Sequence, residues 1–164
     1  MATSGCCAGT LLYVTDFAGD SQKVLEFAGE LANRYDARLE LLYITDPEHT
    51  PSRPDAQMGV QYTLEALARS LKHLKNNTRA LLLFGNPEHV ISKRAADTNA
   101  TLITFPLSGS ESDRVLKRLA RRLTKKCACP VLIFPPNVRK EDTNLLSLKR
   151  CISFTRRACE GRLY

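Results

Sequence analysis

The sequence TLLYVT at residues 10–15 and the sequence RLELLYIT at residues 38–45 are short runs of apolar and β-branched side chains. Runs of this length and composition predict β-strands, and so many apolar residues in succession are typical of strands covered on both faces. Between the two runs, apolar residues recur at helical spacing over residues 24–35. This order of strand, helix and strand predicts one βαβ unit.

The same alternation continues along the chain. After a polar loop at residues 47–57, helical spacing predicts a second helix over residues 61–75, and Asn86-Pro87 has the pattern of an N-cap and first-turn proline. Apolar runs predict three more strands, at residues 79–84, 101–105 and 131–134. Five strands thus alternate with four helices. We therefore expect an α/β fold, a doubly wound five-stranded parallel sheet that is Rossmann-like and has helices on both faces.

Length and composition bound the class of protein. With 164 residues, of which 43% are apolar and 25% charged, the chain has the size and composition of one globular domain. Its apolar runs are far shorter than the roughly 20 residues of a membrane-spanning helix. The first ten residues lack the basic start and apolar run of a secretory signal, so we expect a cytoplasmic protein whose six cysteines are thiols.

Positive charge gathers in the last third of the sequence. The formal net charge is +7, to which residues 1–110 contribute −2 and residues 111–164 contribute +9. Seven of the thirteen residues at positions 114–126 are basic, and the apolar residues among them recur at helical spacing. This pattern predicts an amphipathic basic helix whose charged face is either solvated or binds phosphate, nucleic acid or an acidic partner.

Residues 137–164 form a basic C-terminal extension to a domain that spans residues 1–136. The extension mixes apolar residues such as Leu145, Ile152 and Phe154 with several arginines and lysines. This mixture is compatible with an amphipathic helix. We expect either a charged extension or an element that contacts a dimer, an acidic partner or an anionic membrane surface.

The sequence lacks the motifs of common nucleotide-dependent and nucleophilic enzymes. No Gly-rich dinucleotide fingerprint follows the first strand, and there is no Gly-Lys-Ser/Thr phosphate loop. The acceptor aspartate and the lysine of a phosphorylation receiver would fall on Gly85 and Pro135. No catalytic triad is evident. The Glu-His pairs at residues 48–49 and 88–89 have the character of exposed loop and helix-start residues, so we predict neither catalysis nor a metal site.

Four segments carry a pattern that resembles the universal stress protein family. They lie at the ends of predicted strands, and they are residues 13–17 (YVTDF), 41–47 (LLYITDP), 85–87 (GNP) and 129–133 (CPVLI). Their order and spacing resemble the family over about residues 9–135. The resemblance implies a strand order of 3-2-1-4-5 and a homodimer that pairs through the fifth strand, Val131–Phe134.

In one subgroup of this family, ATP binds at the carboxyl ends of the strands. The resemblance implies that an acidic residue at the position of Asp16 contacts the nucleoside and that Ile44 lines the base pocket. Thr15 and Phe17 occupy neighbouring matched positions. Together with Gly109, in the loop after the fourth strand, these residues form the candidate nucleotide site.

The phosphate end of that site departs from the family pattern. ATP-binding members carry a loop with two glycines and then a Gly-Ser/Thr pair, but here the first glycine position holds Pro106 and the pair falls on Lys117-Arg118. Only Gly109 is kept. Because proline lacks an N–H and a lysine side chain obstructs close approach to the backbone, we do not expect the usual triphosphate cradle.

The sequence therefore favours a non-catalytic, dimeric stress-response module that needs no cofactor and acts through a protein partner. The first alternative is an ATP-binding regulatory protein that uses Asp16 and Ile44. The second is nucleic-acid or anionic-surface binding through residues 114–126 and the extension, although base-stacking aromatic residues are lacking near the basic helix.

Overall fold

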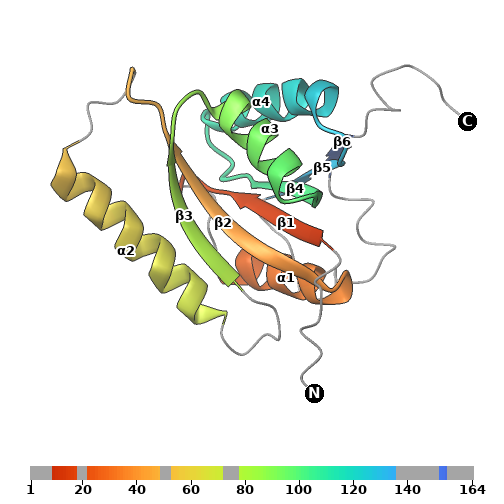
Figure 1. Cartoon of the computed structure of the whole chain (residues 1–164), viewed down its shortest axis with the longest axis horizontal. Helices are drawn as coiled ribbons and strands as arrows, with labels where there is room; N and C mark the ends of the chain where they lie inside the picture. Colours follow the sequence, from red (N-terminus) through yellow and green to blue (C-terminus); the bar gives the residue numbers. More distant parts are fainter. Residues whose placement is uncertain (1–8, 18–21, 49–52, 72–77, 136–151, 155–164) are drawn as a thin grey trace, which may run out of the picture.

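The computed structural model describes residues 9–17, 22–48, 53–71 and 78–135, together with the backbone of residues 152–154. Apart from that short segment, the basic extension lies outside the described residues. The strands are β1 (Gly9–Val14), β2 (Ala37–Thr45), β3 (Thr78–Phe84), β4 (Ala100–Pro106), β5 (Val131–Phe134) and β6 (Ile152–Phe154). The helices are α1 (Gln22–Arg34), α2 (Pro54–Ser70), α3 (Pro87–Asp97) and α4 (Asp113–Lys126) (Figure 1).

The strands form one sheet in the order β3-β2-β1-β4-β5-β6. The first five strands in chain order are parallel, which confirms the predicted fold and the strand order 3-2-1-4-5. The sixth strand was not predicted. Residues 152–154 are extended and pair antiparallel with β5, so an amphipathic helix in the extension is wrong at these three residues.

Two hydrophobic clusters lie on opposite faces of the sheet because successive strand residues point to opposite sides. Leu11 and Tyr13 of β1 pack with α1 and α2, whereas Leu12 and Val14 pack with α3 and α4. Figure 1 shows these two pairs of helices on the two faces. The predicted helices on both faces are therefore confirmed. Among the described helices, none is both long and apolar enough to cross a bilayer.

The starts of α2 and α3 show how proline sets a helix boundary. For α3, the side chain of Asn86 accepts a hydrogen bond from the backbone N–H of His89 at 3.2 Å, and Pro87 occupies the first turn, as predicted. Helix α2 begins at Pro54 rather than near residue 61, so the predicted loop over residues 47–57 is wrong at residues 54–57. Pro54 starts the helix because its fixed φ suits a first turn, where no N–H donor is needed.

A buried ion pair joins α3 to the inner strand β2. The side chain of Glu40 has no solvent exposure and lies on the same sheet face as α3. Arg94 donates from Nε and Nη2 to the two carboxylate oxygens of Glu40, each at 2.8 Å. The hydrogen bond to Glu40 raises the pKa of Arg94 above its ordinary value, and the charge of Glu40 adds to this effect. This bidentate pair fixes both the position and the rotation of α3 on the sheet.

Replacing Arg94 with alanine should destabilise the protein strongly, because it leaves the Glu40 carboxylate buried without a counter-charge. We expect the free energy of unfolding to fall by about 3 kcal/mol, measured by urea denaturation with circular dichroism. Lys93→Ala, at the exposed neighbouring position in the same helix, is the control and should change stability by less than about 0.5 kcal/mol. Equal stability of the two variants would contradict a structural role for the pair.

Candidate functional site

The predicted site residues gather at one edge of the sheet. Strand β1 has β2 on one side and β4 on the other, and both pairings are parallel, so all three strands end at the same edge. Thr15, Asp16 and Phe17 follow β1, Ile44 lies near the end of β2, and Gly109 lies in the loop after β4. This edge, where the chain crosses from one side of β1 to the other, is the usual ligand position in doubly wound sheets.

Thr15 organises the turn that presents Asp16. Its backbone N–H donates to the carbonyl oxygen of Leu42 at 2.9 Å, and its buried Oγ1 accepts from the backbone N–H of Phe17 at 2.8 Å. Phe17 adopts a left-handed backbone conformation with φ of 67°. The turn leaves Asp16 exposed beyond the strand end. The role of Asp16 as a nucleoside ligand stays a prediction, but its location agrees with that role.

The structure does not bring Phe17 and Ile44 together. The ring of Phe17 stacks on Tyr43 with centroids 4.8 Å apart and an interplanar angle of 22°, and it packs with the cluster on the α1 and α2 face. Ile44 packs with the cluster on the α3 and α4 face. Since Phe17 and Ile44 belong to opposite faces, only Ile44 lies on the same face as the start of α4. Phe17 has a packing partner within the fold, while the pocket role of Ile44 remains a prediction.

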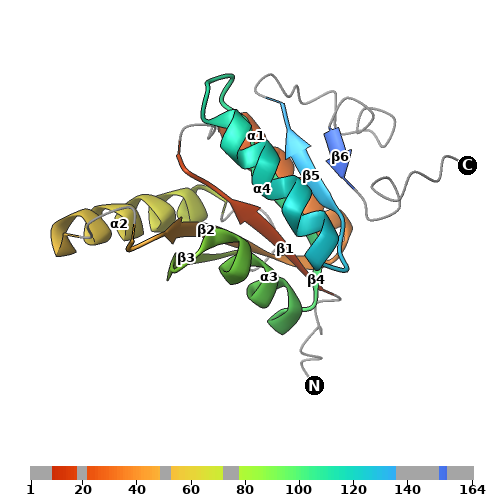
Figure 2. The ribbon, with the colours of Figure 1, turned by 90° about the horizontal axis from the view of Figure 1, so that it is seen from above.

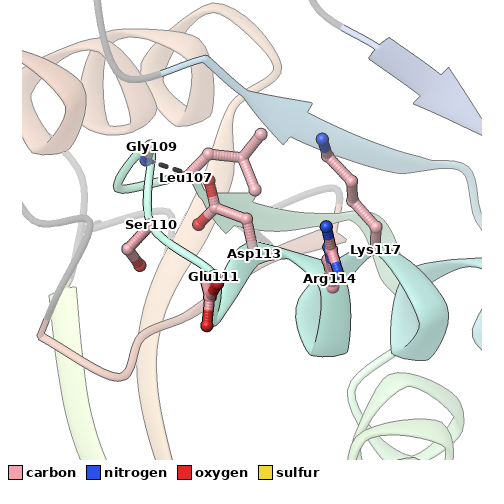
Figure 3. A pocket seen from close by; sticks show the side chains of 7 residues that line it. All are labelled: Leu107, Gly109, Ser110, Glu111, Asp113, Arg114 and Lys117. Carbon is pink, nitrogen blue, oxygen red and sulfur yellow. Dashed lines mark hydrogen bonds between the residues drawn. The ribbon is translucent and has the colours of Figure 1, made fainter.

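The loop between β4 and α4 is held by the carboxylate of Asp113. One carboxylate oxygen, Oδ1, accepts from the backbone N–H of Ser108 at 3.0 Å and from its hydroxyl at 3.1 Å. The other oxygen, Oδ2, accepts from the backbone N–H of Gly109 at 2.9 Å, as the dashed line in Figure 3 marks. Asp113 is only 7% exposed. Gly109 has φ of +79°, which a side chain would disfavour, so glycine suits this tight loop.

These contacts place an anion of the protein itself on the loop amides. Backbone N–H groups before a helix are the donors that usually hold a bound phosphate. Here the amides of Ser108 and Gly109 already face a carboxylate, so a phosphate on the same amides would have to displace it and overcome the repulsion between two anions. The sequence indicated a departure at Pro106 and Lys117 but did not indicate Asp113. An acidic residue in the first turn of the helix was the available signal.

An open cleft lies outside this loop. It has a volume of ≈ 480 Å³ and is lined by Leu107, Gly109, Ser110, Glu111, Asp113, Arg114 and Lys117. Arg114 and Lys117 project from the first turns of α4 (Figure 3). The lining therefore combines two acidic side chains with two basic ones, which is a poor match for a ligand with several negative charges.

Helix α4 has the predicted amphipathic form. Ala120 and Leu123 are buried, while most of its basic residues are exposed. Glu88 of α3 lies 2.6 Å from Nζ of Lys126 and 3.6 Å from Nη1 of Arg122. The hydrogen bond from Lys126 and the positive charges of both residues hold the pKa of Glu88 below its ordinary value. A carboxylate thus already sits against this basic face, next to Val115, which is 68% exposed.

The two Glu-His pairs do not form a cluster in the part of the chain that the structure describes. His49 lies outside the described residues, and Glu88 is engaged with Lys126 and Arg122. Within the described ranges there is no group of three or more His, Cys, Asp or Glu side chains that could hold a metal ion.

Comparison with known proteins identifies relatives of the fold. The family model described as the universal stress protein family matches residues 9–135. The universal stress protein from Archaeoglobus fulgidus, solved in complex with dAMP, has 17% identity and a TM-score of 0.60 over 77% of this chain and 98% of its own. A family protein from Burkholderia pseudomallei has 22% identity and a TM-score of 0.56, covering 80% and 98% of the two chains.

A plant structure shares the same architecture. A universal stress protein family member from Arabidopsis thaliana, solved with AMP bound, has 17% identity and a TM-score of 0.51, covering 80% of this chain and 94% of its own. No curated protein has a sequence that matches this one. These structural likenesses extend over nearly the whole of the solved chains.

Substituting Asp113 with alanine should loosen the loop after β4, because the N–H groups of Ser108 and Gly109 lose their acceptor. We expect the free energy of unfolding to fall by roughly 1–3 kcal/mol and hydrogen exchange at these two amides to accelerate. Glu111→Ala removes an exposed carboxylate from the same loop and is the matched control. Unchanged hydrogen exchange at the amides of Ser108 and Gly109 in Asp113→Ala would contradict the role of this carboxylate in holding the loop.

Proposed function

The chain belongs to the universal stress protein family, and on this basis we propose that it is a non-catalytic regulatory module that acts through a protein partner without a bound triphosphate. The observation that carries the proposal is the Asp113 carboxylate on the amides of Ser108 and Gly109. An internal anion holds the donors that a triphosphate would need. The five parallel strands of the fold are present, while the loop amides that would hold the phosphates are bonded to Asp113.

Among the described residues, the hydroxyls of the loop after β4 contact one another and Asp113 rather than a histidine, which supports the non-catalytic part of this proposal. The hydroxyls of Ser108, Ser110 and Ser112 hydrogen-bond in series along the loop, and Ser108 also donates to Asp113. No histidine in the described part of the chain hydrogen-bonds to these hydroxyls. A serine nucleophile requires a base within hydrogen-bond reach, and the Asp113 carboxylate that Ser108 contacts also accepts from the backbone N–H groups of Ser108 and Gly109.

Two surfaces are suited to a partner. One is the exposed basic face of α4, and the other is the outer edge of the fifth strand, through which we expect a second copy of the chain to pair once β6 no longer covers it. The proposed module acts in the cytoplasm, in keeping with the free thiols of Cys127 and Cys129. We expect the partner to be a protein because the exposed apolar Val115 lies within the basic face and Glu88 neutralises part of its charge, which suits a mixed apolar and acidic surface better than a phosphodiester backbone.

A second candidate is binding of a nucleoside monophosphate. Three universal stress protein structures that resemble this chain were solved with dAMP, cAMP or AMP, and each of these ligands carries a single phosphate group. A ligand with one phosphate group needs fewer backbone N–H donors from the loop after β4 than the triphosphate of ATP does. The exposed Asp16 and the partly buried Ile44 support this alternative, since they lie at the carboxyl ends of neighbouring strands.

Titration calorimetry of the full chain with ATP and with AMP separates the two candidates. For the leading proposal we expect no saturable heat with ATP at concentrations of about 1 mM, and no phosphate release on prolonged incubation. Asp113→Ala should bind ATP more tightly than the wild type if the carboxylate is what excludes the triphosphate.

Asp16→Ala provides the control for the nucleoside end. Heat with AMP that disappears in Asp16→Ala would establish the second candidate instead of the first. Saturable ATP binding by the wild type well below 1 mM would contradict the leading proposal. A denatured sample should also be checked for nucleotide that co-purifies with the protein.

A further inference from the structure

The outer edge of β5 is occupied by the chain's own C-terminal segment. On its inner side β5 pairs parallel with β4, with Ile103 opposite Val131 and Phe105 opposite Ile133. On its outer side it pairs with β6, with Val131 opposite Phe154 and Ile133 opposite Ile152. Figure 2 shows β6 beside β5, beyond the end of the parallel sheet. The described part of β5 therefore has a strand partner along both of its edges.

Without β6, the outer edge of β5 would be unpaired and prone to pair with a strand of another molecule. Its sequence is VLIF, and all four residues are buried. An edge strand exposes a row of unpaired N–H and C=O groups, and proteins usually protect such edges with charged residues, proline or a covering segment. Within β5 there is no charge and no proline, so the covering segment is the protection that remains.

Strand β6 runs in the same direction relative to β5 as the β5 strand of a second copy would. All other strand pairs in the sheet are parallel, whereas β6 runs antiparallel to β5. Two copies of the chain that are related by a two-fold axis perpendicular to the sheet would place their β5 strands antiparallel to each other. The segment β6 therefore occupies the same edge, in the same direction, as the β5 strand of a second copy would.

We propose that β6 and a second copy of this chain compete for the outer edge of β5, so that the chain is monomeric while β6 is paired and dimerises through β5 when β6 is displaced. This inference rests on the self-association that is part of the proposed function and adds its regulation. The pairing of β6 spans three register positions, one fewer than the four residues that β5 offers. Seventeen residues, 135–151, separate the two strands in the sequence, so the entropic cost of closing this loop opposes the pairing of β6.

Ser153→Pro in the full chain tests this competition, because proline removes a backbone donor and disfavours pairing at the centre of β6. Ser153→Ala is the matched control. Light scattering after size exclusion should give 18.3 kDa for the wild type and for Ser153→Ala, and twice that mass for Ser153→Pro at high protein concentration. Circular dichroism checks that the variant keeps its fold.

A peptide of residues 150–156 (RCISFTR), added in excess, supplies β6 in trans. It should convert the Ser153→Pro dimer to monomer, whereas a scrambled peptide should not. A wild type that is already dimeric, a Ser153→Pro variant that stays monomeric at all concentrations, or a dimer that ignores the peptide would each overturn the proposal. These readouts measure mass alone, so a failure here is separate from any result with ATP or AMP.

Discussion

The requirement that a buried carboxylate must be paired connects the sheet to its helices. Glu40 lies without exposure on an inner strand, and Arg94 neutralises it, which places α3 on the sheet. The first turn of α3 then presents Glu88 to Lys126 and Arg122 near the end of α4. At the other end of α4, Asp113 returns to the loop after β4. Three acidic side chains thus link β2, α3, α4 and the loop after β4 in succession.

The carboxyl ends of β1 and β4 differ in how their polar groups are arranged. Around the end of β1, the hydroxyl of Thr15 accepts a hydrogen bond within the turn, and Asp16 is exposed. Around the end of β4, the loop amides are directed at Asp113. Membership of the family supplies a scaffold rather than a mechanism, so the proposal of a partner-binding role rests on this difference between the two strand ends.

Most of the fold could be predicted because it depends on local patterns. Runs such as TLLYVT need no partner to be recognised as buried strands, and Asn86-Pro87 defines a helix start by itself. The features that escaped prediction depend on contacts between distant residues or on the path of a loop. The three residues of β6 are too few for a period to be read and become a strand only beside β5. The stacking of Phe17 depends on its contact with Tyr43 of a neighbouring strand, and the role of Asp113 depends on the path of residues 107–112.

The bonding of Asp113 to the loop amides also affects whether this loop could sense a ligand. The carboxylate is tethered five residues from Ser108, so its effective concentration at the loop amides is set by chain geometry, in the millimolar range or above, and does not vary with the metabolism of the cell. A sensor whose site fills and empties reports the level of its ligand. A site that is filled by its own chain has one constant state, so the loop after β4 would not by itself report the level of a ligand.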